Sequence, residues 1–377
     1  MRIIFVTNNY TPYSGGVVSS INATVQALRR AGHEVCIITL NFLGSTHNDP
    51  SYVVRVPCPV KFVYKNNHMA VPLLVTQHIR KHVELFKPDI VHVHHPFLLG
   101  ASAARVAREY KIPVIFTYHT MYEAYTHYVP LPQYVTKQLV AHMVRTFCNK
   151  VDAIVAPSNA IADVLYAQGV RAPIRVIPSG LQDMFVQQLN ISINPVAQRP
   201  FQLLYVGRFT KEKNIQFILD VMKLLPGDGR YQLKLVGFGA ELTALQHHAY
   251  GQCGFSEQFV QFVHKPPHKD LIRYYRQADL FLFASTTDTQ GLVLAEAMAC
   301  QTPVVAVAGP GQADIVKDAH NGFLVATREQ MADCITQIQA DAHMHDRLRR
   351  GAWGTAQRYQ PDVLVQELIS FYEQILV

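Results

Sequence analysis

Two acidic residues eight positions apart stand out in the second half of the chain as groups that could contact a sugar. Asp288 precedes Gln290 and Gly291, and Glu296 follows within an apolar, helix-like segment. We expect a helix to begin near Gly291, which places Asp288 in the preceding loop and Glu296 in the second turn. Helix-start amides suit a phosphate, and carboxylates accept from sugar hydroxyls. Buried Glu296 then requires a partner, either a ribose diol or a structural ion pair.

The segment GRFTKEKN, residues 207–214, adds two cations in a similar setting. Gly207 ends a predicted strand, and Arg208 and Lys213 follow in the loop that enters the next helix. Charge-assisted hydrogen bonds from such side chains to a diphosphate contribute roughly 1.5–3 kcal/mol each. A solvated basic turn is the alternative interpretation.

A pair of glycines, Gly15 and Gly16, follows the first predicted strand and precedes a helix. This arrangement lets the backbone approach a phosphate closely, although a purely structural turn is an equal alternative. The dinucleotide pattern G-x-G-x-x-G is absent, and the second strand ends without the acidic residue that would hold a ribose. The glycine turn therefore does not indicate an NAD site.

Histidines and tyrosines gather in the first half. His92 and His94 share one face of a predicted strand, but no acidic or cysteine ligand accompanies them, so we predict no metal site. His119 follows another predicted strand and is expected to line a substrate cleft. The aromatic run after it could line the acceptor side or serve only for packing, and it contains Tyr122, Tyr125 and Tyr128.

Short apolar runs alternate with helix-length segments, which predicts parallel sheets covered on both faces. The eleven predicted strands span residues 2–7, 34–40, 89–94, 113–118, 152–158, 174–179, 201–207, 231–237, 258–264, 279–285 and 302–308. We expect an α/β protein with two doubly wound, Rossmann-like domains facing across a cleft. The predicted boundaries are 1–189 for the first domain, 190–200 for a linker, 201–358 for the second domain and 359–377 for a terminal packing helix.

The positive charge is confined to one half of the chain. Of 377 residues, the first 185 hold 17 Lys/Arg and 9 Asp/Glu, a net of +8, whereas the rest hold 17 and 18, a net of −1. This asymmetry predicts an anionic partner for the first half or merely a soluble surface. Six scattered cysteines, a strand-like N-terminus and no apolar run of membrane-spanning length favour a cytoplasmic protein, either soluble or lying on the membrane surface.

Taken together, these segments resemble the retaining glycosyltransferases of family 4, which have the GT-B fold. The specific elements are TDTQGLVLAEAMA followed by TPVVA, and GRFTKEKN. In the first of them Asp288 stands where the family usually has a glutamate. The segments VHVHHPFLLG and TYHTMYEAYTHYVP most resemble members that glucosylate diacylglycerol. The resemblance also implies that the terminal helix crosses back onto the first domain.

The resemblance implies a nucleotide-diphosphate-sugar donor, UDP rather than GDP, held mainly by the second domain without a metal or other cofactor. Arg208 and Lys213 would neutralise the diphosphate, Glu296 would bind the ribose and Asp288 the sugar. His119 would contact the sugar from the first domain. The backbone at Gly15 and Gly16 would close on the diphosphate, and the further donor contacts would come from Gln290, Gly291, Leu292 and Val293.

The acceptor is expected to be a membrane lipid such as diacylglycerol. Residues 61–87 and 133–149 combine basic and apolar side chains, which predicts amphipathic helices that lie on an anionic membrane or pack on a sheet. The alternatives are a soluble or polysaccharide acceptor, and a sugar-nucleotide-binding regulatory module without turnover. Nucleic acid is disfavoured because no reading motif accompanies the charge. The sequence does not predict the oligomeric state.

Overall fold

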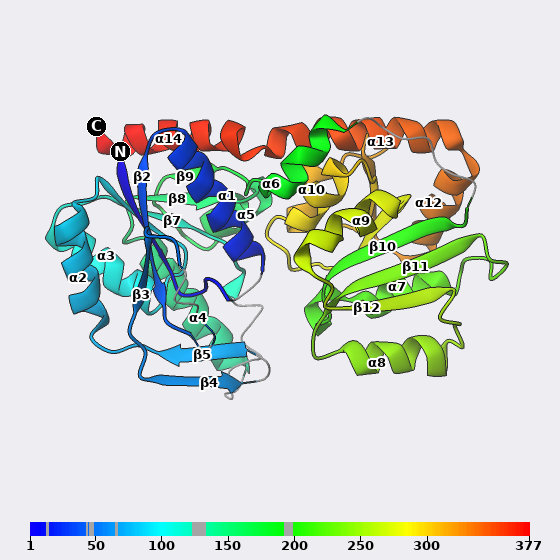
Figure 1. The fold of residues 1–377 in the computed structure, drawn as a ribbon, viewed down its shortest axis with the longest axis horizontal. Coiled ribbons are helices and arrows are strands. Elements are labelled where there is room, and N and C mark those ends of the chain that lie inside the picture. The colour runs from blue at the N-terminus through cyan, green and yellow to red at the C-terminus, as the bar shows by residue number, and fades with distance from the viewer. Residues whose placement is uncertain (13–14, 43, 45–48, 65–66, 123–132, 192–198) are drawn as a thin grey trace. The chain divides into compact units, whose positions relative to one another are not determined.

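Near-continuous apolar runs form the strands of two parallel sheets in the computed structural model, which describes residues 1–12, 15–42, 44, 49–64, 67–122, 133–191 and 199–377 (Figure 1). The chain divides into a first unit, Met1–Gly180 with Pro361–Val377, and a second unit, Leu181–Gln360. Each of the eleven predicted strands is present. The strands β3 (Val53–Val56) and β15 (Gly322–Val325), which lie at the edges of their sheets, were not predicted.

The first unit has a seven-stranded sheet in the order β3-β2-β1-β6-β7-β8-β9. Its other strands are β1 (Arg2–Thr7), β2 (Glu34–Leu40), β6 (Ile90–Val93), β7 (Val114–Thr117), β8 (Ala153–Ala156) and β9 (Ile174–Val176). Its helices are α1 (Gly16–Arg30), α2 (Val75–Phe86), α3 (Leu99–Glu109), α4 (Gln133–Cys148), α5 (Asn159–Ala167) and α14 (Pro361–Leu376). Every strand pair in this sheet is parallel.

Alternate side chains of β1 enter two different cores, as the two-residue period of a strand requires. Ile4 and Val6 pack with residues of α2, α3, α4 and α5, whereas Ile3 and Phe5 pack with residues of α1 and α14. The last helix therefore completes the first unit, which confirms the prediction that it returns to this domain. On this helix Val365 is buried, whereas Val363 is exposed.

The second unit has a six-stranded parallel sheet in the order β12-β11-β10-β13-β14-β15. Its other strands are β10 (Phe201–Arg208), β11 (Tyr231–Phe238), β12 (Val260–His264), β13 (Leu280–Phe283) and β14 (Val304–Val307). Its helices are α6 (Asp183–Val186), α7 (Ile215–Met222), α8 (Leu242–Gln246), α9 (Leu271–Gln277), α10 (Leu292–Ala299), α11 (Pro310–Ile315), α12 (Arg328–Ala340) and α13 (Ala342–Ala356).

The predicted end of the first domain at residue 189 differs from the observed division. Residues 181–189 belong to the second unit, because Leu181, Phe185 and Leu189 are buried in the core formed by α10 and its sheet. The predicted linker at 190–200 falls largely on residues 192–198, which lie outside the described residues.

The predicted amphipathic helix within residues 61–87 is helical only in α2. The preceding residues form an antiparallel hairpin of β4 (Val60–Tyr64) and β5 (Asn67–Val71), which is separate from the seven-stranded sheet (Figure 1). The helical interpretation was wrong there because β-branched and aromatic residues at alternate positions favour a strand.

Two glycines of α13 allow a matched test of the second unit's packing. A Cβ added at Gly351 would meet the backbone oxygen of His320 at 1.9 Å, whereas one at Gly354 would meet nothing within 4 Å. We expect Gly351→Ala to lower the free energy of unfolding by about 1–3 kcal/mol through overpacking. Gly354→Ala should raise it by about 0.5–1 kcal/mol, because alanine favours a helix. Calorimetric melting of both variants checks this, and equal shifts would contradict the packing.

Candidate functional site

The strands β10 and β13 are neighbours in the second unit although two other strands precede β13 in the chain after β10. Their carboxyl ends therefore bring together the segments 208–214 and 284–291, which contain most of the predicted donor residues. In open parallel sheets, ligands bind outside this edge where the strand order reverses. The topology thus assembles the predicted residues of the second unit at one edge.

An ion pair joins the two loops. The ammonium nitrogen of Lys213 lies 2.5 Å from Oδ1 of Asp288, and the two side chains are 13% and 18% exposed. A lysine ammonium has three donors, so one can hold Asp288 while the others face a ligand. From the sequence, Lys213 was expected to face the diphosphate and Asp288 the sugar. The structure places them in contact, 75 positions apart in the chain.

Arg208, the last residue of β10, has a more open position. Its guanidinium is 3.5 Å from Oε1 of Glu212, and its side chain is 41% exposed. The contact is long for a charge-assisted hydrogen bond, although the Glu212 side chain is only 9% exposed. The Arg208 guanidinium can therefore leave Glu212 and bind an anionic ligand instead.

The loop before α10 has the form that the sequence predicted. Gly291 adopts a left-handed conformation, with φ of 71°, and α10 begins at the next residue. The amides of Leu292 and Val293 lie in the first turn, where N–H groups have no partner within the helix. Gly311 donates from its backbone to the carbonyl of Asp288 at 3.0 Å, and a Cβ there would lie 2.5 Å from the amide nitrogen of Gln290. The close approach of Gly311 fixes the loop's shape.

Glu296 is buried in the second turn of α10, and it has the partner that burial demands. It accepts a hydrogen bond of 3.0 Å from the Tyr275 hydroxyl. Burial raises the pKa of Glu296 to about 7, and the hydrogen bond from Tyr275 opposes this shift. The carboxyl group is therefore close to half-protonated at neutral pH. Among the described residues, the partner of Glu296 is this hydroxyl and not the structural ion pair that was the alternative to a ribose.

In the first unit the glycine turn leaves room for a ligand. Gly15 precedes α1 in an extended conformation, and a Cβ on either Gly15 or Gly16 would meet nothing within 4 Å. Neither glycine is required by packing in the described structure. Open space beside the start of α1 is compatible with close approach by a phosphate.

A set of buried histidines lies behind His119, at the carboxyl ends of β6 and β7. His119 Nε2 is 2.8 Å from Nδ1 of His94, and desolvation with the nearby His95 and His92 lowers the pKa of His119 to about 3. His119 is therefore neutral at pH 7. It can offer a hydrogen bond but no positive charge.

Both ring nitrogens of His92 form hydrogen bonds with neighbouring side chains. Its Nδ1 is 2.5 Å from the Tyr372 hydroxyl, and its Nε2 is 2.6 Å from the Thr117 hydroxyl. A metal ion would have to displace one of these bonds. The contact with Tyr372 also ties α14 to the sheet of the first unit.

The predicted acceptor-side tyrosines are only partly described. The ring of Tyr122 packs edge-on against Phe97 at 5.4 Å and Tyr118 at 5.7 Å between centroids. Tyr122 thus packs at the edge of a hydrophobic core, which agrees with the alternative that the aromatic run serves for packing. Tyr125 and Tyr128 lie outside the described residues.

Three residues that support the site were not identified from the sequence. Tyr275 holds Glu296, Ser285 donates to the carbonyl of Glu212 at 3.1 Å, and the fully buried Gln312 donates to the carbonyl of Ser285. Gln312 could have been identified from the sequence, because a polar residue within an apolar segment indicates a buried side chain with a hydrogen-bond partner. Nothing local marked Tyr275.

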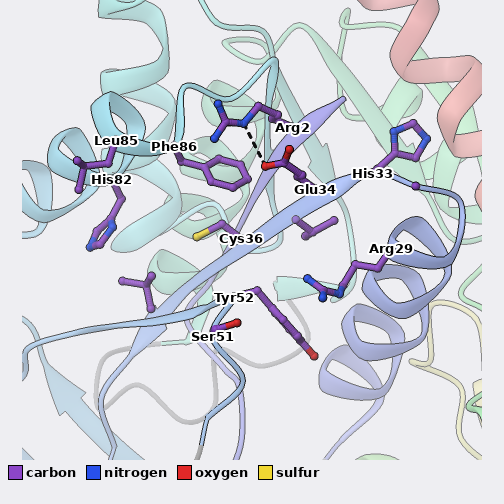
Figure 2. Close-up of a pocket in the computed structure, with 13 residues that line it drawn as sticks. Arg2, Arg29, His33, Glu34, Cys36, Ser51, Tyr52, His82, Leu85 and Phe86 are labelled. Atoms are coloured by element: carbon purple, nitrogen blue, oxygen red, sulfur yellow. Dashed lines mark ion pairs between the residues drawn. The ribbon is translucent and has the colours of Figure 1, made fainter.

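The first unit also contains a pocket of about 610 Å³ near the amino ends of β1 and β2 (Figure 2). Arg2 lies 3.4 Å from Glu34 and over the ring of Phe86, and Arg29 lies over the ring of Tyr52. Because it is at the opposite strand ends from the glycine turn and His119, this pocket is separate from the predicted site. Its cations are already engaged with neighbours.

No helix in the described parts of the chain combines the length and the apolar character needed to cross a bilayer.

Comparisons with known proteins agree with this geometry. Residues 14–183 match the profile described as Glycosyltransferase Family 4, and residues 186–353 match Glycosyl transferases group 1. The alpha-monoglucosyldiacylglycerol synthase of Streptococcus pneumoniae (strain ATCC BAA-255 / R6) is 31% identical over 353 residues, which are 89% of this chain and 78% of that protein. The synthase of the same name from Acholeplasma laidlawii is 26% identical, covering 100% of this chain and 98% of that protein.

Two solved structures have the same fold. Sucrose-phosphate synthase from Thermosynechococcus elongatus has a TM-score of 0.77 with 21% identity, covering 99% of this chain and 98% of that one. Anabaena HepE in complex with UDP-glucose has a TM-score of 0.76 with 18% identity, covering 99% and 100%. The GT-B fold predicted from the sequence is confirmed. With the family profile on the first unit and the identity to the pneumococcal synthase, the chain belongs to glycosyltransferase family 4.

Proposed function

We propose that this glycosyltransferase moves glucose from UDP-glucose to a hydroxyl of diacylglycerol, with retention of the anomeric configuration and without a catalytic metal. The observation that carries the proposal is the edge of the second unit, where Lys213, Asp288 and Arg208 lie beside the start of α10. The names of the relatives, two of them alpha-monoglucosyldiacylglycerol synthases, support the acceptor.

The diphosphate lies between the two cations and the helix start. Lys213 keeps its bond to Asp288 and donates its other protons to phosphate oxygens, while Arg208 leaves Glu212 for the phosphate. The amides of Leu292 and Val293 add donors and the positive end of the helix dipole. Gln290 and Gly291 shape the loop so that these amides face the same point.

The sugar and the ribose are held by the two carboxyl groups. Asp288, fixed by Lys213, accepts from a hydroxyl of the sugar, and Glu296 accepts from the ribose hydroxyls while Tyr275 holds its other side. Because Asp288 and Lys213 are in contact, substitution of Asp288 affects the diphosphate as well as the sugar. The shorter aspartate arm suits this contact.

The reaction proceeds by departure of UDP as charge develops on its diphosphate and on an oxocarbenium-like sugar. Fixed cations and helix-start amides aimed at the leaving group stabilise this charge. The acceptor hydroxyl attacks from the face that UDP leaves, and the departing phosphate takes its proton. His119, neutral at pH 7, can offer a hydrogen bond to a sugar hydroxyl, and the open space beside Gly15 and Gly16 can admit a phosphate. No protein nucleophile is required.

The hairpin β4–β5 supports a lipid acceptor. Its cross-strand pairs Val60 with Val71 and Phe62 with Met69 lie on one face, and all four side chains are exposed. A two-stranded sheet with an exposed apolar face is marginally stable by itself in water. Insertion of this face into the interfacial layer of a membrane would cover it and bring the enzyme to its acceptor.

Helix α4 gives the same indication. Tyr134, Leu139 and Met143 are exposed on it, and the exposed Lys137 and Arg145 are on the same helix. Exposed apolar and basic side chains together favour an anionic bilayer. In this proposal, the positive charge of the first half interacts with anionic lipids at the cytoplasmic membrane surface.

A donor and acceptor screen tests the function. UDP- and GDP-hexoses are offered with diacylglycerol vesicles, and products are identified by mass and by the anomeric coupling constant. We expect α-glucosyldiacylglycerol from UDP-glucose, at a rate that excess EDTA leaves unchanged. Arg208→Ala should lower kcat/KM by about tenfold or more, because a charge-assisted contact to the leaving group is lost. Arg230→Ala, which removes a surface pair with Asp228, serves as the matched control.

The outcomes separate the candidates. Preference for a soluble sugar or a polysaccharide would replace the lipid acceptor. Tight UDP-glucose binding without turnover toward any acceptor would indicate a regulatory module. An unchanged rate in Arg208→Ala would remove this residue from the diphosphate site.

The protonation of Glu296 provides a test of the ribose contact. With its pKa at about 7, this carboxyl carries a proton in part of the free molecules at pH 7. Ribose hydroxyls donate to the ionised form, so bound UDP-glucose should lower this pKa and release a proton. The release should be largest below pH 7, between the pKa values of the bound and free forms, should remain appreciable at pH 7, and should vanish near pH 9, where Glu296 is already ionised. Calorimetric titration in two buffers of different ionisation enthalpy measures it.

The variant Glu296→Gln serves as the control, since glutamine keeps the shape and cannot titrate. We expect its binding enthalpy to be the same in both buffers at pH 7. Equal enthalpies for the unmodified protein, or equal proton release from both proteins, would place the ribose elsewhere.

Membrane contact is tested by co-sedimentation with phosphatidylglycerol vesicles. The double substitution Phe62→Ser and Met69→Ser should lower the partition coefficient about tenfold or more, because burying each such side chain contributes about 1.5–3 kcal/mol. Leu224→Ser, on an exposed leucine of the second unit, should leave partition unchanged. If the hairpin variant sediments like the unmodified protein, the hairpin has no part in membrane binding.

A further inference from the structure

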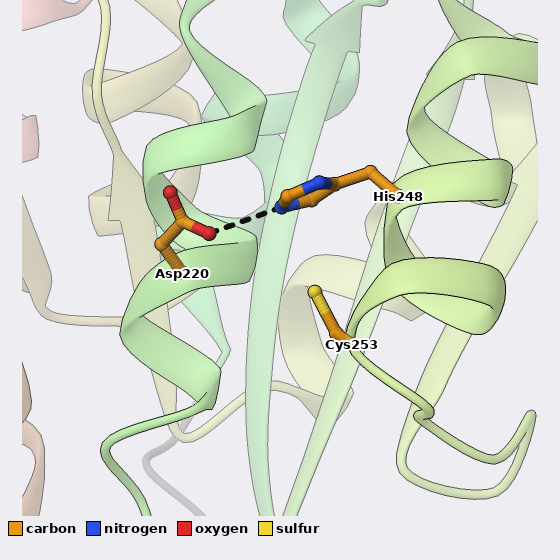
Figure 3. Close-up of side chains that lie close together, drawn as sticks. All are labelled: Asp220, His248 and Cys253. Atoms are coloured by element: carbon orange, nitrogen blue, oxygen red, sulfur yellow. Dashed lines mark hydrogen bonds and ion pairs between the residues drawn. The ribbon is translucent and has the colours of Figure 1, made fainter.

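Three side chains with different ligand atoms meet on the second unit, away from the carboxyl edge of its sheet. Asp220 comes from α7, and His248 and Cys253 come from the π-helix η4 (His247–Gln252) and the residue that follows it (Figure 3). One ligand atom from each lies within 4.8 Å of the others. Among the described residues, this is the one group of three metal-ligating side chains that are so close.

The π-helix is what brings His248 and Cys253 together. In a regular α-helix, residues five apart point about 140° away from each other. Here Cys253 donates from its backbone to the carbonyl of His248 at 2.9 Å, which is the wider hydrogen bond of a π turn. The wider turn lets the thiol and the imidazole face α7 together. Such turns are frequent at functional sites.

The hydrogen bonds of His248 leave a position that a cation can occupy. Nδ1 is 2.7 Å from the amide oxygen of Gln252, which can only accept, so Nδ1 carries a proton. Nε2 is 3.0 Å from a carboxylate oxygen of Asp220, another acceptor. Nε2 and this carboxylate oxygen are therefore close enough to bind one metal ion together. A hydrogen bond on the far nitrogen is the usual support of a metal-bound histidine.

Two cations already compete for Asp220. The ammonium of Lys223 is 3.2 Å from Oδ1, and the guanidinium of Arg328 is 3.1 Å from Oδ2. Desolvation raises the pKa of Asp220, but hydrogen bonds from His248 and Lys223 and the charge of Arg328 outweigh it and lower the pKa overall. A metal ion would have to compete with these two ion pairs for the Asp220 carboxylate. Because Lys223 is largely exposed, it can swing away when another cation arrives.

We propose that Asp220, His248 and Cys253 form a zinc site with solvent as the fourth ligand. A thiolate, an imidazole and a carboxylate are the ligand types that Zn²⁺ takes in proteins, and three protein ligands with an open fourth position is a common arrangement. Binding replaces the proton on Cys253 and any proton on Nε2 of His248, and both go to solvent. The ion would clamp η4 to α7, whose first residue lies two positions after Lys213.

Cobalt gives the test a readout that is independent of glycosyl transfer. Chelator-treated full-length protein is titrated with Co²⁺, and the near-ultraviolet thiolate-to-cobalt band is recorded before Zn²⁺ is added. We expect the band to appear, to be abolished by Zn²⁺, and to be absent in Cys253→Ser. Cys334→Ser, on another partly buried cysteine of the same unit, should keep it. Zn²⁺ should also raise the Tm of the unmodified protein and not that of Cys253→Ser.

The variant Lys223→Met distinguishes a built site from adventitious thiol binding. Removal of the competing ammonium should tighten zinc binding about fivefold, whereas a metal held by Cys253 alone would not respond. Asp220→Asn should weaken binding about tenfold or more. A cobalt band that persists in Cys253→Ser, or equal zinc affinity in Lys223→Met and the unmodified protein, would overturn the proposal. Circular dichroism of each metal-free variant establishes that it is folded.

Discussion

The position of β10 between β11 and β13 is the constraint on which the donor site depends. The chain leaves β10 toward α7 and leaves β13 toward α10, so the two loops diverge from neighbouring strand ends and leave the edge between them accessible. The pair Lys213–Asp288 spans this divergence. In the first unit β1 has the same relation to β2 and β6, and the glycine turn follows β1. Each sheet thus presents one such edge.

The charges at the second unit's edge are balanced before any ligand binds. Lys213 is paired with Asp288, Arg208 has a weak contact with Glu212, and Glu296 is partly protonated. A site in this state has little uncompensated charge to bury. In the reaction that we propose, an arriving diphosphate would supply the negative charge that draws Arg208 from Glu212 and would accept the remaining protons of Lys213.

Features that depend on local sequence pattern were predicted correctly, whereas contacts between residues far apart in the chain were not predicted. Apolar runs identified the parallel strands, and the helix beginning after Gly291 followed from local spacing. Tyr275 could not be connected with Glu296, because the two come from different helices, and a contact between Lys213 and Asp288 requires the strand order. The strands at residues 60–64 and 67–71 were mistaken for part of a helix because a mixture of basic and apolar residues occurs in both kinds of amphipathic element, and only the period of two distinguishes the strand.

Helix α7 connects the two sites that we propose in the second unit. Its amino end follows the turn that holds Lys213, and Asp220 lies near its other end. A zinc ion on Asp220 would therefore restrict the helix that supports a donor contact, without touching the diphosphate or the sugar. The metal-independent transfer that we propose at the carboxyl edge and the proposed metal on the outer helices are compatible for this reason. Chelation should then act on stability, because the cations that face the leaving group belong to the chain itself.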